Sequence, residues 1–142
     1  MEFQQEFNNI LGRSGHIALA TSAGNIPNVR IVSSYYDQAK NTVYFPTFPN
    51  SPKTLEFVQN DKVAFTTIPE EGIQVVRVQQ AVVRKSELSV AELKDGFARN
   101  IPNFEESLGP VIPILELYEL HFSEALVTLS HHQTEKIELT HI

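Results

Sequence analysis

Three polar side chains that could bind an anion gather where a predicted strand ends and a predicted helix begins, in the stretch YFPTFPNSPKT (Tyr44–Thr54). Thr47 would end the strand, Ser51 would cap the helix and Lys53 would lie in its first turn. The N–H groups at a helix N-terminus lack intrahelical partners and carry partial positive charge, which suits a phosphate. Arg30, an isolated charge in the run NVRIVSS, is a fourth candidate. The alternative is a capped turn that binds nothing.

The overall composition limits the kinds of function to consider. The chain has 142 residues, a formal net charge of −6 and no cysteine. This length is typical of one domain, and the acidic balance argues against a broad nucleic-acid surface. The lack of cysteine excludes disulfides, thiolate metal sites and cysteine nucleophiles. Because the sequence shows no secretory leader pattern and no apolar run of about 20 residues, we expect a cytoplasmic protein that does not span a membrane.

Short β-branched and aromatic runs separated by tight turns predict a mainly β fold. We expect seven strands, at residues 16–22, 28–36, 42–47, 62–68, 73–85, 114–122 and 125–130. Since most successive strands lack a crossover helix between them, an antiparallel barrel is favoured over a parallel α/β sheet. No linker or repeat interrupts the chain, so residues 1–142 are predicted to form a single domain. The tail from His131 could be a frayed strand or disordered.

Helices are expected at three places. Apolar residues at spacings of three and four predict the first over residues 3–11. The second begins at Ser51, and Leu55 and Val58 are its predicted buried stripe. The third begins at the capping box SVAE, Ser89–Glu92.

Motifs for other chemistries are missing or weak. There is no GxGxxG fingerprint and no P-loop, and GRSGH is not the nucleophile elbow GxSxG. The adjacent His131 and His132 would diverge along a strand, so a solvated pair is favoured over a metal site. His16 and Tyr36 are candidates for lining a pocket, although a half-core, half-edge role is favoured for Tyr36. No side chain is assigned an acid–base role.

Five short pieces of sequence stand in order at Gly15–Thr21, Pro27–Val32, Tyr44–Thr47, Ser51–Lys53 and Val76–Val78. They match a GxxALAT strand, a PxxRxV strand, a YFxT strand, an SxK helix start and a later vRVxG strand. In this order they resemble the pattern of the FMN-binding split-barrel proteins of the pyridoxamine 5′-phosphate oxidase-like family. The match spans residues 1–85 and continues more loosely to Leu129.

The resemblance implies a six- to seven-stranded antiparallel split β-barrel of Greek-key type. It also implies a homodimer with one FMN in each of two clefts at the subunit interface. Arg30 and Lys53 would bind the FMN phosphate, while the strand at Gln74–Arg77 would approach the ring from the partner subunit. The implied cofactor-binding residues are Arg30, Ile31, Val32, Phe45, Thr47, Ser51, Lys53, Gln74 and Arg77.

Three departures from the family pattern limit what the resemblance implies. Gln80 stands where the family often has glycine, which puts close backbone approach there in doubt. Pro46 lies inside the YFxT strand, which suggests an edge or a bulge. The sequence also has no counterpart of the long C-terminal extension that completes the substrate pocket of true pyridoxamine phosphate oxidases, so vitamin B6 oxidation is not expected.

The leading functional hypothesis is an FMN-dependent oxidoreductase that uses a small-molecule substrate or electron donor. No catalytic residue and no metal site is predicted, because the flavin would carry the redox chemistry. One alternative is a flavin- or haem-binding module without turnover, such as a stress or redox-sensing protein. Another is a split barrel that binds a deazaflavin or a B6 phosphate.

Overall fold

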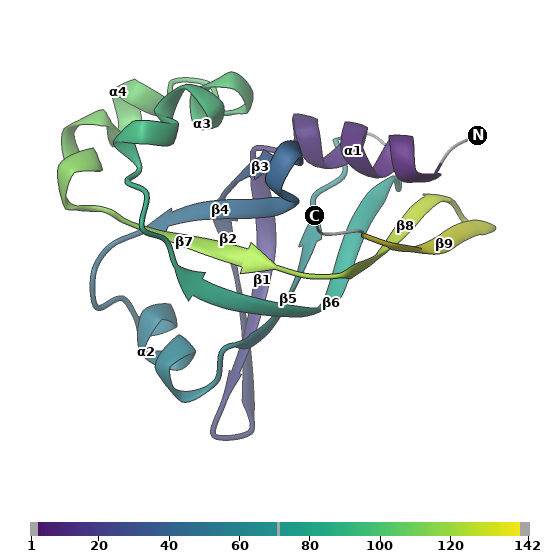
Figure 1. Ribbon diagram of the computed structural model, residues 1–142, viewed down its shortest axis with the longest axis horizontal. Helices are drawn as coiled ribbons and strands as arrows, with labels where there is room; N and C mark the ends of the chain where they lie inside the picture. Colours follow the sequence, from purple (N-terminus) through teal and green to yellow (C-terminus); the bar gives the residue numbers. More distant parts are fainter. Residues whose placement is uncertain (1–2, 71, 140–142) are drawn as a thin grey trace.

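Nine strands form one curled antiparallel sheet in the part of the chain that the computed structural model describes, residues 3–70 and 72–139 (Figure 1). The strands are β1 (His16–Ala23), β2 (Ile26–Ser33), β3 (Tyr35–Asp37), β4 (Thr42–Thr47), β5 (Lys62–Thr67), β6 (Val75–Lys85), β7 (Glu116–His121), β8 (Glu124–Ser130) and β9 (Gln133–Glu138). From one edge the order is β2-β1-β5-β6-β7-β4-β3, and β8 pairs with β6 and β9. The mainly β, antiparallel architecture predicted from the turn-rich sequence is confirmed.

The sheet divides at β6. One edge of this strand pairs with β5, and the other edge pairs with β8 through Val75–Arg77 and with β7 through Val82–Lys85. The register between β5 and β6 shifts between Val63 and Phe65. The length of the apolar run predicts such an irregularity, since a strand that pairs throughout must bend or bulge to follow a curled sheet.

Short helices cover the sheet. They are α1 (Phe3–Arg13), η1 (Gln38–Lys40), α2 (Pro52–Gln59), η2 (Ala91–Leu93), α3 (Lys94–Asn100), α4 (Phe104–Leu108) and η3 (Gly109–Ile114). α1 contacts β3, β6, β8 and β9, and buries Phe7, Ile10 and Leu11 in the main core at the predicted spacing (Figure 1). A second, smaller cluster joins α3 and α4 to Tyr44 and Leu117.

The buried stripe predicted for α2 is wrong. Thr54 and Phe57 face the core, while Leu55 and Val58 are 56% and 86% exposed. Both pairs have a spacing of three residues and lie on adjacent stripes of the helix, so periodicity alone favours neither. The edge-on contact of the Phe57 ring with Phe45, at a centroid distance of 6.0 Å, accounts for the stripe that is buried.

The structure divides one predicted strand and decides between the two alternatives left open for the tail. The strand expected over residues 28–36 is two strands, β2 and β3, because β2 pairs with β1 whereas β3 pairs with β4, with Ser34 between the two strands. The tail forms β9, which pairs with β8. Residues 140–142, also part of the predicted tail, lie outside the described residues.

The capping box before α3 is confirmed. The Ser89 N–H donates to the Glu92 carboxylate (2.8 Å), and the Glu92 N–H donates to Ser89 Oγ (3.2 Å). Within residues 3–70 and 72–139, no helix has the length and apolar character needed to cross a bilayer.

Candidate functional site

Arg30 on β2 forms an ion pair with Glu56 on α2. Its Nη2 lies 2.7 Å from Glu56 Oε1, and the two side chains are 20% and 22% exposed. Nη1 donates to Thr21 Oγ1 (2.9 Å) and to the Leu19 carbonyl (3.3 Å), both on β1. Thr21 Oγ1 in turn donates to the same carboxylate oxygen of Glu56 (2.7 Å). These contacts tie α2 to the edge of the sheet and hold the guanidinium in one orientation.

Lys53 lies in the first turn of α2, one helical turn before Glu56. Burial lowers the pKa of its ammonium, the nearby guanidinium of Arg30 lowers it further, and the charge of Glu56 opposes the shift. The structure therefore places the two cations predicted to bind a phosphate within electrostatic reach of each other and of Glu56, which forms an ion pair with Arg30 alone of the two. Glu56 was not predicted from the sequence, and its spacing of three residues from Lys53 was the available signal.

Thr47 and Ser51 meet at the turn between β4 and α2. Their hydroxyl oxygens are 3.1 Å apart, and Thr47 is buried. Ser51 occupies the N-cap position in an extended conformation, but its side chain makes no capping hydrogen bond. The carbonyl of Ser51 accepts from the Thr54 hydroxyl (2.7 Å). The hydroxyl of Ser51 therefore does not occupy the N–H groups at the start of the helix.

Val32 and Phe45, two of the predicted cofactor-binding residues, have side chains in the core. Val32 is 7% exposed and Phe45 is fully buried, with its ring stacked on Tyr118. In this conformation a role in binding would fall to their backbone. Strand alternation explains the difference from Ile31, which faces the opposite side of β2 and is 58% exposed.

β2 is an edge strand, paired only with β1 among the described strands. The Val29 N–H, on the side away from β1, is satisfied by the side chain of Asn28 (2.9 Å to Oδ1). Ile31, two residues along, presents its N–H and C=O to the same edge. β2 therefore offers a backbone edge, beginning beside Arg30, to which a planar heterocycle could hydrogen-bond.

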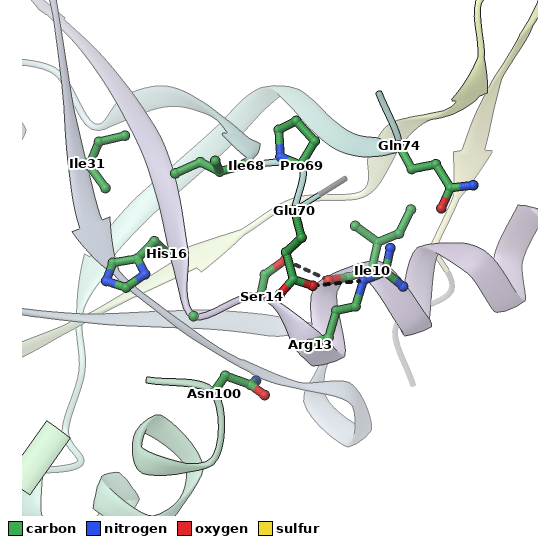
Figure 2. A pocket seen from close by; sticks show the side chains of 11 residues that line it. Ile10, Arg13, Ser14, His16, Ile31, Ile68, Pro69, Glu70, Gln74 and Asn100 are labelled. Atoms are coloured by element: carbon green, nitrogen blue, oxygen red, sulfur yellow. Dashed lines mark hydrogen bonds and ion pairs between the residues drawn. The ribbon is translucent and has the colours of Figure 1, made fainter. Parts of the chain in front are cut away.

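A pocket of about 230 Å³ lies among the end of α1, the start of β1 and the β5–β6 turn (Figure 2). Two of the predicted cofactor-binding residues, Ile31 and Gln74, line it together with His16. Its apolar wall includes Ile10, Ile68 and Pro69. Tyr36 does not line this pocket: it is buried, and its hydroxyl donates to Asn41 Oδ1 (3.1 Å).

Residues that the sequence did not single out complete the pocket. Arg13 Nε lies 3.7 Å from Glu70 Oε1 across it, and Figure 2 shows the two side chains reaching toward each other. Because both are exposed, this ion pair is weak. Asn100 Nδ2 donates to the Gly12 carbonyl (2.8 Å), and a Cβ on Gly15 would come within 2.6 Å of the Asn100 carbonyl oxygen. These residues come from helix ends and loops far apart in the chain, so no local motif could have indicated them.

Arg77 on β6 is exposed and lies apart from Arg30. Direct strand pairing links Ile31 to Ala18, Ala18 to Thr66 and Thr66 to Arg77. Their side chains therefore form one row on the outer face of the sheet. Three strand spacings separate the ends of the row, a distance of about 14 Å. Within one chain, Arg77 thus shares a face with Ile31 without contacting it.

The profile of a family described as pyridoxamine 5′-phosphate oxidase-like matches residues 10–133 of the chain. The protein belongs to this family. The matched range contains both Arg30 and Lys53 as well as the pocket residues Ile31 and Gln74, so the resemblance drawn from five short motifs is confirmed. No curated protein matches the sequence.

Solved structures share the fold of this pyridoxamine 5′-phosphate oxidase-like protein. A heme binding protein from Mycobacterium smegmatis has a TM-score of 0.78 and 9% identity, with 97% of this chain and 58% of that protein covered. General stress protein 26 from Bacillus anthracis has a TM-score of 0.75 and 15% identity, with coverage of 98% and 100%. A Clostridium acetobutylicum protein of the pyridoxinephosphate oxidase family, related to general stress protein 26, has a TM-score of 0.71 and 12% identity, with coverage of 98% and 97%.

These similarities, all below 25% identity, establish the split-barrel fold that the sequence motifs implied. The chain spans 58% of the length of the Mycobacterium smegmatis protein.

Proposed function

We propose that this pyridoxamine 5′-phosphate oxidase-like protein binds FMN and acts as a flavin-dependent oxidoreductase on a small-molecule substrate or electron donor. The observation that carries the proposal is the pair of cations at α2: Arg30 forms an ion pair with Glu56 of this helix, and Lys53 lies in its first turn. A phosphate suits two convergent cations and a helix N-terminus better than any neutral group does. The proposal takes residues 1–142 as a single domain that works in the cytoplasm.

Arg30 keeps donors available for the phosphate. Hydrogen bonds within the protein use three of the five N–H groups of its guanidinium, and the other two have no partner among the described residues. Lys53 adds an ammonium, and Thr47 and Ser51 add two neighbouring hydroxyls. In the proposed complex these four residues bind the phosphate beside the first N–H groups of α2.

The flavin ring would lie along the free edge of β2, where the backbone of Arg30–Val32 offers hydrogen-bonding groups. Ile31 and Gln74 line the pocket near that edge. Phe45 would contribute through its backbone, and Arg77 would approach from a partner subunit. When bound, FMN supplies the electron-transfer chemistry, while the chain binds the flavin, orients it and limits its exposure to water. No side chain is proposed as an acid or base.

A second copy of the chain would complete the site. The outer face of β2, β1 and β5 presents Val29 and Ile31, 64% and 58% exposed, beside the small side chains of Ala18, Ala20 and Ala64. An exposed apolar face of this kind is a surface that another protein commonly covers. We propose that the protein is a homodimer and that this face forms the interface.

Sedimentation velocity is expected to show a dimer at micromolar concentration with FMN bound. Val29→Asp should shift the protein toward the monomer, because burying an unpaired carboxylate in an interface costs several kcal/mol. Val58→Asp, on an exposed position of α2, is the matched control and should leave the dimer intact. A parent protein that sediments as a monomer while holding FMN would refute the proposed assembly.

The visible spectrum of the purified protein tests the proposed ligand. Flavin gives paired bands in the blue and near ultraviolet, whereas haem gives one intense Soret band. We expect the flavin bands, and we expect NADH or NADPH to bleach them in a stopped-flow experiment. Flavin bands that persist with both reductants would favour a flavin-binding module without turnover. A protein that takes up no added FMN would contradict the proposal.

Haem is a second candidate ligand, favoured by one pocket. His131, at the β8–β9 turn, lines a cavity of about 730 Å³ together with Arg13 and Gln74. Histidine is a common ligand of haem iron, and one structure with the same fold is described as a heme binding protein. In this alternative the protein is a haem-binding or redox-sensing module. A Soret band that disappears in His131→Ala would favour it over FMN.

A further inference from the structure

We propose that Glu56 is a built-in counter-ion that sets the charge, and with it the anion affinity, of the Arg30–Lys53 site. This inference rests on the proposed function and deepens it, since it assigns the specificity of the site to a residue outside the SxK and PxxRxV motifs. With Glu56 in place, a phosphate group alone binds weakly. Tight binding then requires the contacts of an attached ring as well, so the site selects FMN over free phosphate.

The carboxylate of Glu56 is held by three side-chain donors. Oε1 accepts from Thr21 Oγ1 (2.7 Å) and from Arg30 Nη2 (2.7 Å), and Oε2 accepts from Asn28 Nδ2 (3.3 Å). The hydrogen bond from Thr21, followed by that from Arg30, lowers the pKa of the Glu56 carboxyl, although burial acts against this. The group is therefore a fixed negative charge at neutral pH.

The charge of Glu56 lowers the electrostatic free energy that a phosphate gains when it binds between Arg30 and Lys53. Arg30 and Lys53 carry two positive charges and Glu56 carries one negative charge, so the group has one net positive charge. Without the carboxylate the two cations would repel each other, and an incoming phosphate would relieve that repulsion. With the carboxylate present, much of the repulsion is already relieved, and the phosphate gains less.

The same contact also orients Arg30. Its hydrogen bonds to Glu56, Thr21 and the Leu19 carbonyl hold the guanidinium so that two N–H groups remain for a ligand. Glu56 thus lowers the affinity of the site for an anion while it keeps the Arg30 guanidinium in the orientation that binding needs. A substitution that removes the charge but keeps an acceptor oxygen separates these two effects.

Glu56→Gln is that substitution, because the Gln carbonyl oxygen can still accept from Thr21 and Arg30. We expect it to bind FMN about tenfold more tightly than the parent, with a steeper loss of affinity as salt is added. Inorganic phosphate should raise its melting temperature clearly, while barely raising that of the parent. Glu56→Ala removes the same charge and is measured alongside, so the phosphate comparison does not depend on the folding of one variant.

Two control variants test whether the gain in phosphate protection comes from loss of the charge at position 56. Glu56→Asp retains the charge and should show no gain in phosphate protection. Glu106→Gln, an exposed residue of α4, changes the net charge far from the site and should behave as the parent. The inference is overturned if neutralising Glu56 leaves phosphate protection unchanged or reduced, or if Glu106→Gln produces the same gain. Failure of the parent to bind FMN would overturn the proposed function instead, and the phosphate melts would still decide the role of Glu56.

Discussion

FMN is expected to bind at least about 100-fold more tightly than riboflavin, which differs from it only by lacking the phosphate. Arg30, Lys53 and the N-terminus of α2 would act on that group alone. Each hydrogen bond to a charged group contributes about 1.5–3 kcal/mol, so the loss of two or more accounts for the difference. The charges of Arg30, Lys53 and Glu56 sum to one net positive charge, which preserves the preference for FMN over riboflavin. Titration of the apoprotein with each flavin, followed by flavin fluorescence, measures it.

Salt provides the internal control for the flavin comparison. Added salt should narrow the gap between the two ligands, since screening weakens the contribution of a half-buried cation such as Lys53 to phosphate binding. Riboflavin binding should change little. Equal titration curves for the two flavins would mean that the turn Tyr44–Thr54 is only a capped turn, and the FMN proposal would lose its main support.

Arg30→Ala is expected to weaken FMN binding by about 2–4 kcal/mol, and Lys53→Ala by about 1–2 kcal/mol. The two variants should differ more sharply in the stability of the apoprotein. Removing Arg30 leaves the half-buried carboxylate of Glu56 without its cationic partner, which should destabilise the apoprotein by about 1–2 kcal/mol. That corresponds to a melting temperature lower by about 3–8 °C. Lys53→Ala should leave the melting temperature unchanged, because no hydrogen bond or ion pair of its side chain is present among the described residues.

Arg84→Ala is the matched control, since Arg84 is an exposed arginine of β6 with no hydrogen bond or ion pair among the described residues. Adding Glu56→Gln to Arg30→Ala should recover part of the lost stability, because it removes the unpaired charge. FMN titrations at low and high salt and thermal melts of the apo forms test the set. If Arg30→Ala binds FMN and melts like the parent, Arg30 neither binds the phosphate nor stabilises the apoprotein through Glu56.

The features that the sequence alone determined are local ones. The apolar spacing of α1, the capping box at Ser89–Glu92 and the turn residues between strands each act within a few positions of the chain. Local backbone preferences and hydrophobic periodicity are sufficient to specify such elements. The candidate phosphate residues belong to the same class, because Thr47, Ser51 and Lys53 all lie at one strand-to-helix turn.

Tertiary packing decided what sequence spacing leaves open. Leu55–Val58 and Thr54–Phe57 have the same helical spacing, and only the contact of Phe57 with the core rings chooses between them. The partner of Arg30 is Glu56, 26 residues further along the chain, and their meeting depends on where α2 lies against the edge of the sheet. The pocket beside Ile31 likewise combines residues from helix ends and loops, which no helical or strand periodicity in the sequence connects. An ion pair or a pocket of this kind depends on the relative placement of whole elements, which long-range burial determines and which no short window of sequence contains.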